Sequence, residues 1–147
     1  MSKISTLEKL SIIIYDHNFD KIHYALVIAS AAAAIGKPTT LFFTMGATRA
    51  LLENYDDNPE PWSKMPLSNS HGTGEEQNEV FREMGIATFD ELIEACIQFE
   101  VKFLVCEMGV KANKFEHKAF RKDLKIQHGG LVTFLNDVSK DGAILFI

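Results

Sequence analysis

The sequence predicts a three-layer α/β/α domain built on a mostly parallel sheet of about five strands. Short runs rich in β-branched and aromatic residues alternate along the chain with stretches of helical periodicity, a pattern typical of a parallel sheet covered on both faces. One of these runs, residues 101–106, ends on a cysteine that is followed closely by a glycine. No internal repeat or linker divides residues 1–147, so we expect one domain.

The composition favours a globular protein and argues against nucleic-acid and membrane partners. The 147 residues are 46% hydrophobic and 24% charged, which is ordinary for a chain that buries one sizeable core. The net charge of −5 comes without a basic run, so nucleic acid is not an expected partner. The longest apolar stretch, residues 24–35, is too short to span a bilayer and follows a charged start unlike a secretory leader. We therefore expect a cytoplasmic protein without membrane association.

The first strand and helix are predicted by a short apolar run and the signals that follow it. Residues 10–15 (LSIIIY) are typical of a central parallel strand. Asn18 can cap a helix over residues 19–35, which Gly36 ends. Residues 29–34 are nearly all alanine, so we expect this helix to be buried against the sheet or a neighbouring subunit.

A second strand and a long irregular loop come next. Residues 39–44 (TTLFFT) predict a strand, and Met45-Gly46 predicts a tight turn into a short helix over residues 47–54. Residues 55–74 have no periodicity, and loops of this length are usually lids, interface segments or disordered. Trp62 and Met65 within the loop would gain from being covered, so plain disorder is the less favoured interpretation.

The second half of the chain continues the alternation. Thr88 with Glu91 three residues later forms a capping-box pattern. The helix that follows has Phe89, Leu92, Ile93, Cys96 and Ile97 on one face. The remaining elements are predicted as helices over 75–84, 112–122 and 130–138 and strands over 101–106, 124–128 and 143–147.

Cys106 is the strongest candidate for chemistry. In an open α/β sheet, ligands and reactive groups gather beyond the carboxyl ends of the strands, and Cys106 closes a predicted strand. A nucleophilic cysteine needs thiolate character, which the start of a following helix favours and the neighbouring Glu107 opposes. The alternative is a small buried hydrophobe, the common fate of a free cysteine. Cys96, on an otherwise apolar helix face, is expected in the core.

Other polar residues are predicted at the same edge of the sheet. The turn Thr44-Met45-Gly46 ends the second strand, and Arg49 just beyond it is placed to hold anionic oxygens. Asp16-His17-Asn18 ends the first strand, where His17 is placed to act as a base or to stabilise a thiolate. The alternatives are a capping turn and a solvated arginine. His71 reaches this edge only if the long loop folds over it. No spacing of cysteine and histidine predicts a metal site or a disulfide framework.

The order of these segments resembles the DsrE/DsrF-like sulfur-relay family. Residues 11–36, the strand and turn at 41–46, and the helix, strand and cysteine block at 85–110 are similar to that family. The weaker segment 129–138 matches the family's last glycine turn and helix. Members commonly carry a serine after the residue corresponding to Met108, where this chain has Gly109.

The resemblance implies a sulfur carrier or sulfurtransferase-like protein that uses no cofactor. Cys106 would accept a sulfane or thiosulfonate sulfur from a donor protein or small sulfur compound and pass it to a partner thiol. Met108 and Gly109 would then lie beside the sulfur. Because members of the family usually form oligomers, the resemblance also implies a homo-oligomer.

Three alternatives stay open on the sequence. The first is a non-catalytic interaction subunit of a sulfur relay, in which Cys106 is inert. The second is a nucleotide- or flavin-binding module, although no GxGxxG follows the first strand and no Walker lysine is present. The third is a thiol peroxidase, for which Thr44 and Arg49 supply residue types without a recognisable motif.

Overall fold

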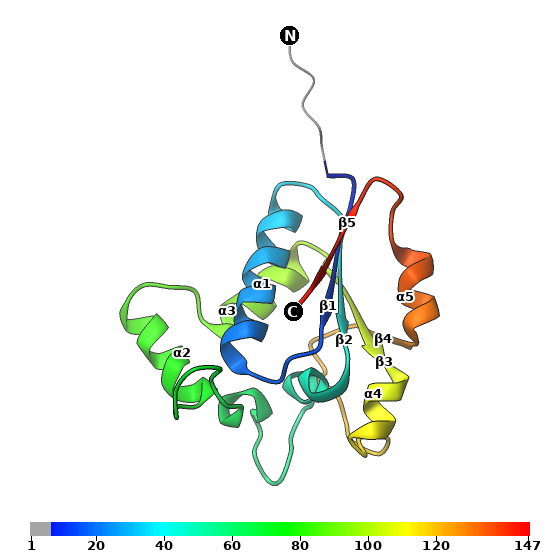
Figure 1. The fold of residues 1–147 in the computed structure, drawn as a ribbon. Helices are drawn as coiled ribbons and strands as arrows, with labels where there is room; N and C mark the ends of the chain where they lie inside the picture. The colour runs from blue at the N-terminus through cyan, green and yellow to red at the C-terminus, as the bar shows by residue number, and fades with distance from the viewer. Residues whose placement is uncertain (1–6) are drawn as a thin grey trace.

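Five parallel strands form a single sheet in the computed structural model, which describes residues 7–147 (Figure 1). Their order across the sheet is β4-β3-β2-β1-β5, and every neighbouring pair is parallel. The strands are β1 (Leu10–Ile14), β2 (Thr39–Phe43), β3 (Lys102–Cys106), β4 (Ile126–Gly129) and β5 (Ala143–Phe146). The prediction of a mostly parallel sheet of about five strands is confirmed.

Helices cover both faces of this sheet, which gives the predicted three layers. Figure 1 shows α1, α2 and α3 on one side of the sheet and α4 and α5 on the other. The α-helices are α1 (Phe19–Ala34), α2 (Gly74–Glu83), α3 (Phe89–Gln98), α4 (Glu107–Ala112) and α5 (Leu131–Asp137). Two 3₁₀ helices, η1 (Met45–Leu51) and η2 (Pro61–Lys64), lie in the connection between β2 and α2.

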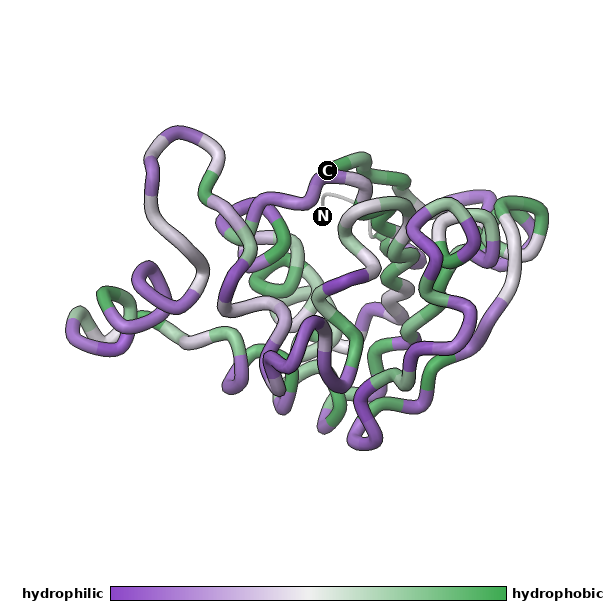
Figure 2. Tube along the Cα trace, turned by 90° about the horizontal axis from the view of Figure 1, so that it is seen from below, coloured by the Kyte–Doolittle hydropathy of each residue, from purple (hydrophilic) through white to green (hydrophobic). Residues whose placement is uncertain are grey.

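The sheet separates two clusters of buried apolar side chains. Because successive side chains on a strand point to opposite faces, β3 sends Phe103 and Val105 into the larger cluster beneath α1 and α3. Leu104 and Cys106 enter a smaller cluster with Phe42 and Phe134 on the α5 side. Seen from the carboxyl edge of the strands, hydrophilic residues are frequent in the loops at the periphery (Figure 2).

The alanine-rich helix packs on the sheet as expected. Helix α1 contacts β1 and β2, and three of its alanines are buried: Ala25, Ala29 and Ala32. Their small side chains allow α1 to approach the sheet closely. Gly36 ends the helix with φ +85°, a conformation that glycine adopts without steric cost. Asn18 occupies the N-cap position, but its side chain makes no capping hydrogen bond; its backbone N–H donates to Asp16 Oδ1 at 2.8 Å.

Local signals place α3 correctly apart from one residue. The capping box of Thr88 and Glu91 is formed on both sides, and four of the five predicted face residues are buried. Ile97, one residue before the end of the helix, is 39% exposed.

The helix predicted over residues 112–122 is wrong. The chain enters α4 directly after Cys106 and leaves it at Ala112, and residues 113–125 follow an irregular path. Backbone bonds to the end of η1 replace helical ones: Glu53 N–H donates to Ala119 O at 2.8 Å, and Arg121 N–H donates to Leu51 O at 2.9 Å. The short helix predicted over 47–54 is likewise a 3₁₀ helix over Met45–Leu51.

The long loop over residues 55–74 is docked on the molecule. Trp62 and Met65 are 4% and 1% exposed, and Trp62 stacks on Phe89 with ring centroids 4.7 Å apart. Its backbone is also tied down, since Phe19 N–H donates to Pro66 O at 2.8 Å. Trp62 belongs to the larger apolar cluster, so this part of the loop lies across the sheet from the side chain of Cys106.

Candidate functional site

Cys106 closes β3 at the carboxyl edge of the sheet. It pairs with Gly129 of β4, and it is only 6% exposed. Its side chain lies in the smaller apolar cluster. In the same cluster, the rings of Phe42 and Phe134 stack on each other with their centroids 5.0 Å apart. Helix α4 begins at the next residue, so Cys106 is in the N-cap position, although its side chain forms no capping hydrogen bond. The thiol is therefore at a strand end, as predicted, but in apolar surroundings.

The turn after β2 lies directly against α4. Thr44 is 9% exposed, and its N–H donates to Ile14 O at 3.0 Å, which joins the ends of β1 and β2. Met45 has φ 47°, an uncommon backbone conformation for a residue other than glycine. A β-carbon on Gly109 would lie 2.4 Å from Met45 N. Gly109 is thus required for the close approach of α4 to this turn.

Two residues around Cys106 face solvent. Glu107 is exposed, and Met108 is 68% exposed on the surface of α4. Asn113 Nδ2 donates to Gly109 O at 2.9 Å just after the helix ends. Met108 therefore lies at the surface, two residues from the thiol, where an approaching molecule would meet it.

Arg49, His17 and Gly46 come together in a cavity of about 290 Å³, here named the Arg49 cavity. A β-carbon on Gly46 would lie 2.9 Å from His17 Cβ, so these two residues are in direct contact. The cavity is lined by His17, Gly46, Arg49, Tyr55, Met65, Pro66, Asn113 and Phe115. Cys106 is not among these residues, and Asn18 and Thr44 are not either. The structure therefore separates the residues predicted at this edge into a cysteine on the α5 side and a histidine–arginine pair in a cavity.

The sequence of the whole domain decides the family. The profile of the DsrE/DsrF/DrsH-like family matches residues 6–146. The chain belongs to this family. Uncharacterized protein YrkE of Bacillus subtilis (strain 168) is 27% identical over 157 aligned residues, which cover 95% of this chain and 97% of that protein. The crystal structure of the ychN protein from Escherichia coli superposes with a TM-score of 0.58 at 12% identity, covering 96% of this chain and 100% of that one. The second likeness shows the shared fold.

The other thiol of this DsrE-like chain is closed inside the core. Cys96 has no exposed surface and belongs to the larger apolar cluster beneath the sheet. Burial raises the pKa of the Cys96 thiol to about 12, because a low-dielectric surrounding disfavours the thiolate. Cys96 and Cys106 lie in different clusters on opposite faces of the sheet, and both are free cysteines.

Several residues that shape these surroundings were not predicted. Three of the residues that line the Arg49 cavity come from irregular segments. Tyr55 belongs to the long loop, and Asn113 and Phe115 belong to the segment that was wrongly predicted to be a helix. Phe134 covers the cluster that holds Cys106. Its position on the inner face of α5 was accessible from helical periodicity, whereas the three cavity residues depend on how irregular segments fold back.

Other kinds of site find no support within residues 7–147. No three histidine, cysteine or acidic side chains in this range gather where they could hold a metal ion. Nor does any helix in the described part of the chain have both the length and the hydrophobicity needed to cross a membrane.

Proposed function

We propose that this protein is a cytoplasmic sulfur carrier in which Cys106 accepts a sulfane or thiosulfonate sulfur and delivers it to a partner thiol. Membership of the DsrE/DsrF/DrsH-like family supports a role in sulfur relay. The observation that carries the proposal is the position of Cys106 at the carboxyl end of a central parallel strand, where reactive groups of α/β proteins gather.

The contrast between the two cysteines supports Cys106 as the acceptor. The thiolate is the nucleophilic form of cysteine, and the pKa of about 12 leaves Cys96 protonated at neutral pH. Cys96 is also enclosed by the larger cluster. Cys106 lies at an edge of the sheet where the chain turns into α4, and it retains 6% exposure where Cys96 has none.

The proposed chemistry is displacement at sulfur without net oxidation. The Cys106 thiolate attacks the outer sulfur of a donor persulfide; a new S–S bond forms, the donor's S–S bond breaks, and the donor leaves as a thiolate. With tetrathionate, the thiolate attacks an inner sulfur and thiosulfate leaves, which places a thiosulfonate group on the cysteine. An acceptor thiolate then attacks the added sulfur that is bonded to the Cys106 sulfur, and the Cys106 thiolate leaves. The acceptor thereby receives the sulfane sulfur of the persulfide, or that sulfur together with its sulfonate group in the thiosulfonate adduct.

The strand next to Cys106 ends on two glycines with different surroundings. Gly129 pairs with Cys106, and a β-carbon there would lie 2.8 Å from Thr133 Oγ1, so α5 packs closely against this strand end. A β-carbon on the next residue, Gly130, would meet no atom within 4 Å. Because Cys106 is only 6% exposed, the proposal requires its thiol to move outward when it meets a donor.

Sulfur loading tests this function directly. The native protein is incubated with polysulfide, desalted and treated with cyanide, which releases the outer sulfur of a persulfide as thiocyanate. We expect thiocyanate from the wild type and from Cys96→Ser, and none from Cys106→Ser. Equal release from Cys106→Ser and the wild type would refute the assignment.

A second candidate, a non-catalytic subunit of a sulfur-relay complex, is favoured by the apolar burial of Cys106. It is also favoured by the exposed apolar side chains Leu131, Val132 and Leu135 on the outer surface of α5. The same surface supports the proposal that the protein assembles as a homo-oligomer or with a relay partner, because exposed apolar clusters mark contact sites. Thiol titration of the native protein separates this candidate from the carrier: an unreactive Cys106 favours it.

A further inference from the structure

The polar groups of Arg49, in the cavity named after it, are only partly satisfied by residues 7–147. Within residues 7–147, no carboxylate forms an ion pair with Arg49. Its Nε is buried and has no hydrogen-bond partner among the described residues. Its guanidinium lies over the ring of Tyr55, 4.8 Å from the ring centroid. Stacking on an aromatic ring holds the guanidinium in place and leaves its N–H groups in need of an acceptor.

The surroundings strengthen the positive character of this cavity. Among the described residues that line it, none is acidic. His17 contributes an imidazole on the side formed by Gly46, and Lys118 Nζ lies 5.7 Å from the centroid of the Tyr55 ring. In a chain with a net charge of −5, a cavity lined by an arginine and a histidine without a carboxylate is a local exception that favours an anion.

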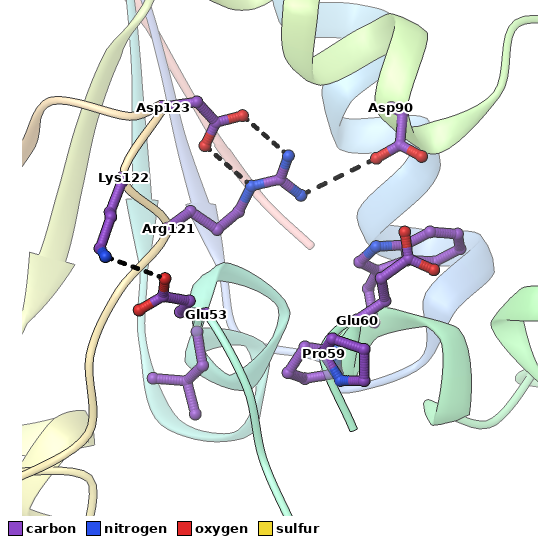
Figure 3. Close-up of a pocket in the computed structure, with 10 residues that line it drawn as sticks. Glu53, Pro59, Glu60, Asp90, Arg121, Lys122 and Asp123 are labelled. Carbon is purple, nitrogen blue, oxygen red and sulfur yellow. Dashed lines mark hydrogen bonds and ion pairs between the residues drawn. The ribbon is translucent and has the colours of Figure 1, made fainter. Parts of the chain in front are cut away.

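A second cavity of the molecule contains an arginine that is paired with carboxylates of the same chain. Figure 3 shows Arg121 between two carboxylates in a cavity of about 260 Å³. The Nη2 atom of Arg121 lies 2.9 Å from Asp123 Oδ2, and its Nη1 atom lies 3.9 Å from Asp90 Oδ1. Lys122 on the same rim pairs with Glu53 at 3.4 Å. The lining of that cavity holds four acidic side chains, Glu53, Glu60, Asp90 and Asp123, against the two cations Arg121 and Lys122. Its cations are therefore outnumbered by carboxylates, and it offers no comparable demand for an anion.

The wall of the Arg49 cavity combines apolar side chains with its polar ones. Tyr55 and Phe115 meet edge to face with centroids 5.6 Å apart, and Met65 and Pro66 complete the wall. A volume of about 290 Å³ is at the small end of ligand pockets. Convergent polar groups in an apolar concavity are the usual make-up of a small-molecule site.

We propose that the Arg49 cavity binds a small organic anion, whose oxyanion group is held by Arg49 and His17 while its apolar body packs against Tyr55, Phe115 and Met65. The guanidinium offers paired donors to a carboxylate or sulfonate. This binding is separate from the sulfur chemistry at Cys106, because Cys106 does not line the cavity. It also goes beyond the proposed function, which requires no such ligand.

Titration with simple probes tests the proposal. Benzoate, benzenesulfonate and inorganic phosphate are added separately to ¹⁵N-labelled protein, and benzyl alcohol serves as the uncharged analogue. We expect one or both organic anions to shift the Nε–H resonance of Arg49 saturably, and the stronger of the two identifies the preferred head group. Phosphate and benzyl alcohol should bind at least about tenfold more weakly, since each lacks one half of the interaction.

Variants assign the effect to the cavity. Because the Arg49 variants lack the Nε–H group, binding to all variants is followed through the backbone amide resonance of Gly46, which lines the same cavity. Arg49→Met should weaken organic-anion binding by about tenfold or more, while Arg82→Met on the surface of α2 should bind like the wild type. Arg49→Lys keeps the positive charge but loses the planar guanidinium with its paired donors, so it should also weaken organic-anion binding. This variant provides the test if Arg49→Met does not fold. Cys106→Ser should bind unchanged. The proposal is overturned if no organic anion gives a saturable shift, if phosphate binds as tightly as the organic anions, or if Arg49→Lys and Arg82→Met bind alike.

Discussion

Gly109 in α4 and Met45 in the turn after β2 are in backbone contact: a β-carbon on Gly109 would lie 2.4 Å from Met45 N. This contact joins the helix that follows Cys106 to the strand end next to it. It explains why a glycine, which normally weakens a helix, is found inside α4. The contact also fixes the direction in which the chain leaves Cys106.

Gly109→Ala should therefore destabilise the protein by about 2 kcal/mol, because the clash involves backbone that cannot rotate away and outweighs the gain in helix propensity. Urea denaturation measures the change. Gly130→Ala is the matched control, since its β-carbon would meet nothing within 4 Å; it should cost less than about 1 kcal/mol, the usual range for a helix N-cap. Equal losses in the two variants would contradict the close contact.

Asp137 links three elements and should make stability depend on acid. Burial raises its pKa, but hydrogen bonds from Lys102, Lys9 and Thr40 outweigh that effect and hold the pKa at about 2, against an ordinary value of 3.8. A carboxyl with a lowered folded-state pKa contributes stability above its unfolded pKa, and this contribution is lost as the pH falls through the folded value.

Between about pH 5 and about pH 2, the wild type should lose about 2 kcal/mol that Asp137→Asn does not lose. Urea denaturation at the two pH values measures this difference. Asp141→Asn, at an exposed aspartate, should keep the acid loss of the wild type. An acid loss that persists undiminished in Asp137→Asn would show that other carboxyls are responsible.

The docking of the long loop depends on Trp62. Its ring is 4% exposed and packs between Phe19 and Phe89, so Trp62→Ala should cost about 3–5 kcal/mol, as is usual for a buried aromatic residue. Trp62→Phe should retain part of the stacking and lose less. Thermal unfolding measures both variants, and a loss below about 1 kcal/mol in Trp62→Ala, small for a core truncation, would mean that the loop is not anchored there.

The elements predicted well are those with signals in their own sequence. Thr88 and Glu91 form the capping box that begins α3, and the β-branched and apolar runs of β1, β2 and β3 are buried as expected. The parallel order follows from alternating strands and helices. These features depend on local chemistry and on the need to cover an apolar sheet, so they are accessible without knowledge of distant contacts.

The elements that sequence patterns missed depend on distant partners. Gly109 is found inside α4, and the reason for a glycine there is the backbone of Met45, which lies against it. Residues 113–125 have helical composition, but their backbone bonds to Leu51 and Glu53 instead. The division of the candidate site also depends on tertiary structure, since the Arg49 cavity is completed by Tyr55 and Phe115 from two irregular segments.

The central claim is that Cys106 is the sulfur acceptor, and intact mass spectrometry tests it most directly. Native protein is incubated with thiosulfate, tetrathionate or polysulfide, beside Cys106→Ser and Cys96→Ser. We expect a sulfur-containing mass gain in the wild type and in Cys96→Ser that is absent from Cys106→Ser, with the added mass distinguishing a persulfide from a thiosulfonate. If no donor modifies the native wild type, while both thiols react once the protein is denatured, the carrier account is contradicted and the interaction-subunit account takes its place.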